Sequence, residues 1–285
     1  MNPRRDAFER LEGRFEVRVL EPSPPSVHDA PWFADDPLSL EDLPPEREVV
    51  LPIETGHLTW NSLCADDPAL EAWCRERWLG AWRRLPEPPP NLESTRRALH
   101  MLAEHALAPA RQSATGKIGL RYTHGGFGTP FFGDDRQVRI EGIELVVQQG
   151  GEETRAPLST LGAARDLIGT DWSQIALYEP TTASSPDEGL TVSSDGAGFV
   201  GDLFGFGASV MEQLRTEARP EENPSRVQLW PEHLDVAVEI GDERPAARAT
   251  FGVSVGDAFH LEPYVYVVPW EKVEPSDIWN AEHFN

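Results

Sequence analysis

The sequence predicts an α+β fold built mainly on antiparallel sheet, with packed helices and a helical appendage at the N-terminal end. Three β-branched and aromatic runs between Arg226 and Trp270 are separated by turn residues, which is typical of neighbouring strands. Helical periodicity marks the segments around 92–108 and 204–214. A length of 285 residues suits either one large α+β domain or two modest ones.

The first 90 residues divide into an arm and a helical segment. Residues 1–45 combine many prolines with acidic residues, so we expect an extended or disordered arm. Residues 46–90 are expected to hold a strand at Glu48–Ile53 and a tryptophan-rich helix between Asp67 and Pro86. A tryptophan stripe could stack on a ring-shaped ligand, but packing against a core is the preferred interpretation.

The main α+β body is expected to span residues 91–285. Its first helix runs from about Leu92 to Ala108, and a strand at Lys117–His124 follows. On that strand Lys117 and Arg121 point to one side, which makes them candidates for holding a carboxylate or phosphate. Pairing with local acidic residues is the alternative. Further elements are expected in this order: strands at 137–140 and 143–148, and a short helix at 158–168.

A glycine motif precedes the second helical run. Gly196, Gly198 and Gly201 have the G-x-G-x-x-G spacing of a dinucleotide-binding turn, between an expected strand and a helix. The strands that follow are not interleaved with helices, so we regard a nucleotide cofactor as unlikely to explain the motif. Close helix packing is preferred, with Gly201 and Gly205 allowing another backbone to approach and Asp195 capping the helix.

A short internal repeat relates two parts of the main body. In each part a basic residue opens a strand, a histidine follows seven positions later, and a Phe-Gly pair comes further downstream: Lys117, His124 and Phe127-Gly128 in the first part, Arg226, His233 and Phe251-Gly252 in the second. This pattern predicts two related halves, 90–170 and 195–275, around a pseudo-twofold axis. A groove between such halves is a natural ligand site.

Four segments resemble a family of actinobacterial hypothetical proteins: Gly125–Asp135, Val227–His233, Pro263–Trp270 and Trp279–Ala281. The likeness covers most residues from about 45 onward. It implies a bacterial, cytoplasmic protein. It supplies no catalytic residues, because no activity is assigned to that family.

The charge of the chain limits its partners. A formal net charge of −23 repels phosphate groups, so neither nucleic acid nor an anionic membrane is an expected partner. The sequence has no apolar run of the roughly 20 residues that a membrane span requires. We therefore expect a soluble cytoplasmic protein, for which the sequence does not indicate an oligomeric state.

One functional hypothesis is a metal-dependent enzyme. Two pairs of metal-ligand residues, each two positions apart and so on one side of an extended chain, occur near the C-terminal end: His233 with Asp235, and His260 with Glu262. Together they would suit an open iron, zinc or manganese site. His124 or Tyr264 would then act as the proton donor.

The preferred hypothesis is a soluble protein that binds a small molecule between its two halves. Lys117 and Arg121 would hold an acidic group of the ligand, and Trp230 and Tyr266 would cover its apolar part. Packing on the sheet face is the alternative role of those aromatic residues. A third hypothesis is a non-catalytic scaffold whose acidic surface and proline-rich arm recruit a basic protein partner.

Overall fold

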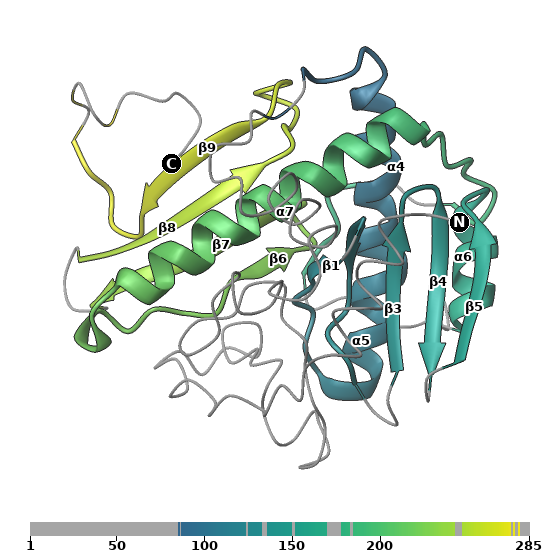
Figure 1. The fold of residues 1–285 in the computed structure, drawn as a ribbon, viewed down its shortest axis with the longest axis horizontal. Helices are drawn as coiled ribbons and strands as arrows, with labels where there is room; N and C mark the ends of the chain where they lie inside the picture. The colour runs from purple at the N-terminus through teal and green to yellow at the C-terminus, as the bar shows by residue number, and fades with distance from the viewer. Residues whose placement is uncertain are drawn as a thin grey trace, which may run out of the picture.

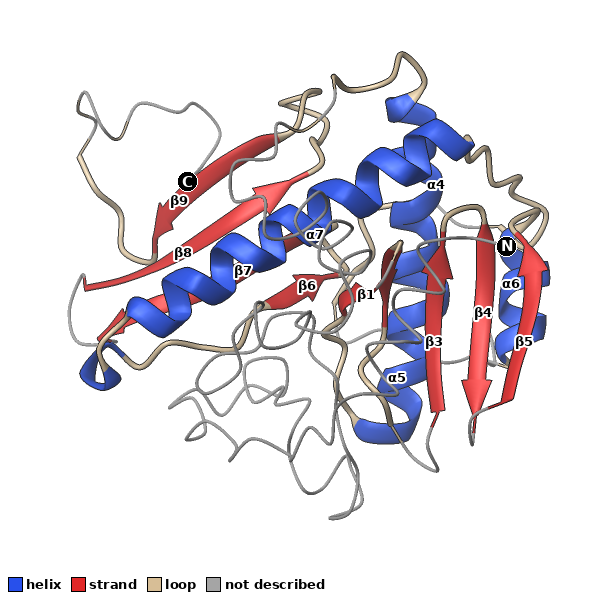
Figure 2. Cartoon of the chain, viewed as in Figure 1, coloured by secondary structure: helices blue, strands red, loops and turns tan. Residues whose placement is uncertain are grey.

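The computed structural model describes residues 85, 87–123, 125–132, 136–149, 152–169, 178–182, 185–242, 247–274, 276 and 279. This part of the chain forms two antiparallel sheets with packed helices, which confirms the predicted α+β class (Figure 1 and Figure 2). The predicted arm at 1–45, the predicted strand at Glu48–Ile53 and the tryptophan-rich helix except for Leu85 lie outside the described residues, as does His124. None of the helices in the described ranges is long and apolar enough to cross a membrane.

The first described helix changes its winding part of the way along. Its three consecutive segments are α4 at Leu92–Leu102, the π-helical turn η2 at Ala103–Leu107 and α5 at Ala108–Thr115. The helix thus passes Pro109 and ends at Gly116, whose φ of 76° is left-handed. In a π-turn the hydrogen bonds span five residues, so the carbonyl that a proline ring would meet in an α-helix is moved aside. The predicted end near Ala108 is therefore wrong.

The first sheet is a five-stranded meander in which every neighbouring pair is antiparallel. Its strands, in spatial as in chain order, are β1 at Arg121–Thr123, β2 at Gly126–Gly128, β3 at Arg136–Glu141, β4 at Glu144–Gln149 and β5 at Glu152–Pro157. The helix α6 at Leu161–Ile168 follows, with the Thr160 hydroxyl accepting from the Ala163 N–H. The sequence predicts β3, β4 and α6, but it does not predict β5 or the glycine-rich β2.

The second sheet follows the long helix α7 at Ser194–Glu217 and a 3-10 turn, η3, at Pro220–Glu222. Its strands also pair in chain order: β6 at Gln228–Trp230, β7 at Asp235–Asp242, β8 at Ala247–Ser254 and β9 at Tyr264–Pro269. The neighbouring strands that the sequence predicts between Arg226 and Trp270 are confirmed, except that a turn at 231–234 divides the first of the three predicted runs into β6 and β7.

The glycine motif lies inside α7 rather than in a strand-to-helix turn. The helix begins at Ser194. The preceding residue, Ser193, is its N-cap, because the Ser193 hydroxyl accepts from the Gly196 N–H at 3.0 Å. The prediction of Asp195 as the cap is wrong, because Asp195 belongs to the first turn. A Cβ atom added at Gly201 would lie 2.9 Å from the carbonyl carbon of Gly125, so the predicted close backbone approach is confirmed there. At Gly205 the prediction is wrong, because the added atom would meet the Tyr122 side chain, 3.1 Å from its hydroxyl oxygen.

The two sheets meet where β1 and β6 begin. Leu120 and Leu229 exchange two backbone hydrogen bonds of 2.8 Å in an antiparallel bridge. These residues occupy the same place in the predicted repeat, three positions after Lys117 and Arg226. The downstream match does not hold, because Phe127-Gly128 lies on the second strand of its sheet and Phe251-Gly252 on the third.

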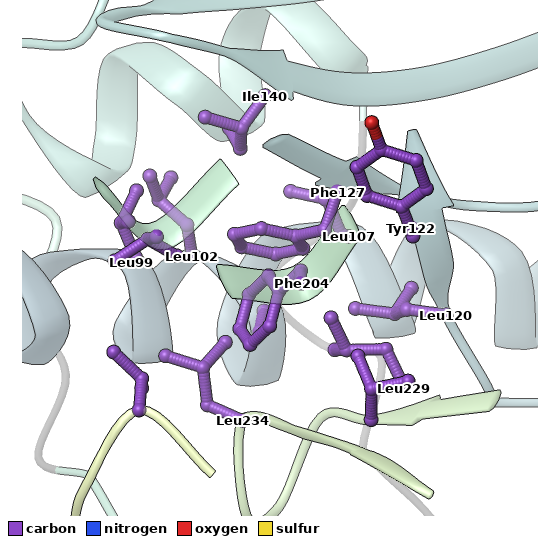
Figure 3. Packing of buried hydrophobic residues seen from close by; sticks show 14 of the residues in the cluster. Leu99, Leu102, Leu107, Leu120, Tyr122, Phe127, Ile140, Phe204, Leu229 and Leu234 are labelled. Atoms are coloured by element: carbon purple, nitrogen blue, oxygen red, sulfur yellow. The ribbon is translucent and has the colours of Figure 1, made fainter. Parts of the chain in front are cut away.

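One hydrophobic core serves both sheets (Figure 3). The helix α7 runs across both of them, and its Phe204 meets Phe127 of β2 edge to face, with ring centroids 5.8 Å apart. Leucines from α4 and from β6 pack in the same cluster. Because this core is continuous, the polar residues at the junction of the sheets are held on a common rigid frame.

Candidate functional site around Asp235

The turn between β6 and β7, together with the first residue of β7, brings two acidic residues to the junction. It spans Pro231–Leu234 and connects Trp230 to Asp235, which are paired across the two strands. Leu234 has a positive φ of 50°, an unfavourable conformation for a leucine, while its side chain is buried in the core (Figure 3). Core packing therefore maintains a strained backbone between Glu232 and Asp235, a feature that is common at functional sites.

Asp235 is the centre of the candidate site. Its carboxyl group is buried, and Oδ2 accepts a hydrogen bond from the Tyr266 hydroxyl. Its Oδ1 has no hydrogen-bond partner in the described part of the chain. Burial raises the pKa of Asp235, although nearby His233 and the Tyr266 hydrogen bond act in the opposite direction.

Tyr266 reaches Asp235 because Gly252 has no side chain. The strand β8 separates the two residues, and Gly252 on β8 is paired with Tyr266 on β9. A Cβ atom at Gly252 would lie only 2.3 Å from Cζ of the Tyr266 ring. The ring thus lies over the glycine, and its hydroxyl reaches Asp235 on β7.

Glu232 is the second acidic residue of the cluster. Its Oε2 is buried and has no hydrogen-bond partner among the described residues. Burial raises the pKa of Glu232, and the carboxylates of Asp235 and Glu104 raise it further. The backbone of the turn and His233 oppose this change only in part.

Tyr178 and His100 border the same acidic cluster. The Tyr178 hydroxyl is buried without a partner in the described ranges, and burial together with Glu232 and Glu104 raises its pKa. Burial lowers the pKa of His100 against the influence of Glu104, so the imidazole is neutral near pH 7. The His100 Nε2 lies 3.8 Å from Glu104 Oε1 without a hydrogen bond to it.

Glu104 differs from Glu232 because its carboxylate is fully hydrogen-bonded. It lies in the π-turn η2 and accepts from the backbone N–H groups of Thr181 and Thr182, at 2.7 and 2.8 Å, and from both hydroxyls. The neighbouring His105 donates from Nε2 to the Thr182 carbonyl at 2.9 Å, which fixes the tautomer because a carbonyl only accepts. Glu104 and His105 therefore anchor the 181–182 segment to the helix.

The structure does not bring the four predicted metal ligands together. His233 lies in the turn and is exposed, whereas Asp235 begins β7 and is buried, so the two are not alternate residues of one strand. Likewise His260 and Glu262 precede β9, which begins at Tyr264. No group of three His, Cys, Asp or Glu side chains in the described ranges could hold a metal ion.

Three of the predicted ligand-binding residues share the sheet face of Asp235. The Leu120–Leu229 bridge sets Arg121 beside Gln228, and pairing continues from Gln228 through Ala237 and Gly252 to Tyr266. Trp230 belongs to the adjacent alternate row, which includes Asp235 itself. Lys117 lies four residues before Arg121, ahead of β1.

The predicted proton donor Tyr264 lies on the same face, further from the junction. Its hydroxyl donates to Asp257 Oδ2 at 2.5 Å, and its ring is tilted against His260 with centroids 5.3 Å apart. Asp257 also accepts from the N–H groups of Phe259 and His260, at 2.6 and 2.7 Å. Burial raises the pKa of Asp257, but these hydrogen bonds outweigh it and bring the pKa below its usual value.

Sequence reasoning missed four members of the cluster: His100, Glu104, Tyr178 and Glu232. The i, i+4 spacing of His100 and Glu104 was an available signal, and Glu232 adjoins a residue that the metal hypothesis used. Tyr178 carries no comparable signal, because only the fold brings its segment to the turn.

The assembled cluster can accept hydrogen bonds from a buried partner. Asp235 Oδ1 and Glu232 Oε2 are acceptors, the Tyr178 hydroxyl can donate or accept, and His100 offers an imidazole nitrogen. Comparison of the chain with protein-family models, with curated proteins and with solved structures finds no match.

Proposed function

We propose that the protein binds a small molecule at the junction of its two halves, in the cluster around Asp235. The observation that carries this proposal is that Oδ1 of Asp235, a residue only 4 % exposed, has no hydrogen-bond partner among the described residues. Buried polar atoms are nearly always hydrogen-bonded, and one that lacks a partner within the chain is expected where an outside group supplies it.

The position of the cluster supports a binding site. His100 and Glu104 belong to the first described helix. Glu232 lies in the first turn of the second sheet, Asp235 begins β7 directly after it, and Tyr266 lies on the last strand. The site therefore uses both parts of the fold, as sites between two halves of a protein do. Arg121 and Trp230 lie on the same face and remain candidates for contacting the ligand.

The energetic cost of the cluster also favours function over packing. Each buried polar group without a partner costs about 1–3 kcal/mol, and in the described part of the chain such atoms include one each on His100, Tyr178, Glu232 and Asp235. An apolar core would avoid this cost. Perturbed ionisation concentrated in one region is typical of functional sites, where stability is exchanged for binding or chemistry.

A thermal-shift screen of the full chain tests the proposal. Cationic, neutral and anionic metabolites would be screened against the wild type, Asp235→Asn and the exposed control Asp187→Asn. We expect at least one compound to raise the melting temperature of the wild type and of Asp187→Asn but not of Asp235→Asn, because a ligand stabilises only the state that binds it.

The proposal fails if every stabilising compound acts equally on Asp235→Asn, or if no compound stabilises the wild type. Should Asp235→Asn not fold, Glu232→Gln provides the same comparison, because Glu232 contributes the second unpaired carboxylate oxygen.

A further inference from the structure

We infer that the ligand is a small organic cation with an amino group, bound between the carboxylates of Asp235 and Glu232. This inference rests on the proposed function and adds the chemical class of the ligand. It depends on which atoms of the cluster are unpaired and on the charges around them.

The unpaired atoms of the two acidic residues require a donor. Asp235 uses Oδ2 to accept from Tyr266. Among the described residues no donor reaches Asp235 Oδ1 or Glu232 Oε2, so both oxygens are available to an outside group. An ionised carboxylate only accepts hydrogen bonds, whereas an ammonium group offers three N–H donors and no acceptor. The Tyr178 hydroxyl, which is under the influence of Glu232, offers a further acceptor on that side of the cluster.

The charge balance of the cluster also favours a cation over a neutral or anionic ligand. In the described ranges neither Glu232 nor Asp235 forms an ion pair with an arginine or lysine, and the carboxylate of Glu104 is close to Glu232. His100 is neutral near pH 7, and His233 is exposed. A buried carboxylate is stable only with a compensating charge or a proton, so an ammonium group fits this cluster and an anion does not.

The remaining groups limit the orientation of the bound amine. Glu104 is already saturated by Thr181 and Thr182, so it contributes charge to the site but no free acceptor. Tyr266 fixes the orientation of the Asp235 carboxyl group. The net charge of −23 further raises the concentration of cations near the surface.

Calorimetric titration of the full chain with charge-matched compounds tests the inference. The amines are methylamine, ethanolamine, putrescine and agmatine, and the counterparts of putrescine are 1,4-butanediol, which is neutral, and succinate, which is anionic. Salt at about 0.15 M suppresses loose attraction to the acidic surface. Glu232→Gln and Asp235→Asn are compared with Asp187→Asn.

We expect at least one amine to bind with a stoichiometry of one, and neither butanediol nor succinate to bind. Glu232→Gln and Asp235→Asn should each weaken the amine at least about tenfold, while Asp187→Asn leaves it unchanged. Amine binding that ignores both site variants, or no binding by any of the four amines, overturns the inference. If butanediol or succinate binds in an Asp235-dependent way, the cationic class is wrong and the proposed site stands.

Discussion

The Tyr266 ring lies across Gly252, and its hydroxyl donates a hydrogen bond to Asp235. A residue of β9 thus binds a buried carboxyl group on β7. The contact spans three strands and depends on the missing side chain of the middle one. It fixes one oxygen of Asp235 and leaves the other unpaired in the described part of the chain. This relationship connects the geometry of the second sheet to the candidate site.

Replacing Gly252 by alanine should displace the Tyr266 ring. The added Cβ atom would lie 2.3 Å from Cζ of that ring, so we expect a loss of about 1–3 kcal/mol in the free energy of unfolding. Urea denaturation would measure it, with Gly189→Ala as a control because no atom lies within 4 Å of its added Cβ. When Tyr266 is already replaced by alanine, Gly252→Ala should reduce the free energy of unfolding by less than it does in the wild type. An equal reduction in both proteins would contradict the contact between Gly252 and the Tyr266 ring.

Asp235→Asn should make the stability of the ligand-free protein less dependent on pH. Because the folded-state pKa of Asp235 is raised, its contribution is complete below the ordinary aspartate pKa and is lost as the pH rises through the folded pKa. Asparagine, which does not ionise, avoids that loss. The stability of the variant relative to the wild type should therefore increase as the pH rises above the ordinary aspartate pKa of about 4. A difference in urea midpoint that does not grow with pH would refute this prediction.

Two glycines of α7 should respond to alanine in opposite ways. Gly198 has open space around its added Cβ, so Gly198→Ala should stabilise the protein by about 0.5–1 kcal/mol through helix propensity. At Gly201 the same atom would meet the Gly125 backbone at 2.9 Å, so Gly201→Ala should destabilise it. Thermal denaturation of the two variants compares them directly, and a stabilised Gly201→Ala would disprove the close contact between α7 and β2.

Glu104→Gln should loosen the segment that Glu104 anchors. A neutral amide cannot accept all four hydrogen bonds from Thr181 and Thr182 through carboxylate oxygens, so we expect a loss of about 2–4 kcal/mol. Faster hydrogen exchange at the two threonine amides would report the local effect. Glu93→Gln, an exposed change on the same helix, serves as the control and should leave exchange unaltered.

The sequence predicts those elements whose pattern is local. Alternation and turn residues reveal the strands of the second sheet, and Gly201 and Gly205 of α7 correctly indicate close packing. The π-turn at Ala103–Leu107 has no such pattern, and it carries the helix past Pro109. The strand β2 is hidden because its glycines are required by contact with β3, where a Cβ atom at Gly126 would lie 2.1 Å from the Ile140 carbonyl oxygen.

The candidate site was only partly predictable. Asp235 and Tyr266 are identified as candidates because they lie in a strand-rich region, but their hydrogen bond depends on pairing across Gly252. The metal hypothesis assumes that His233 and Asp235 are alternate residues of a strand, and the turn with its left-handed Leu234 separates them. No local sequence pattern indicates that Tyr178 is close enough to Glu232 and Glu104 to be influenced by them, because only the tertiary fold brings these residues together.

The carboxyl-carbon NMR signal of Asp235, titrated with acid in the absence and presence of putrescine, tests the central claim most directly. In the free protein burial should place the midpoint above that of ordinary aspartates, and a bound amine should lower it because the cation favours the ionised form. A midpoint that is ordinary in the free protein, or that putrescine leaves unchanged while it binds, would contradict an amine site at Asp235.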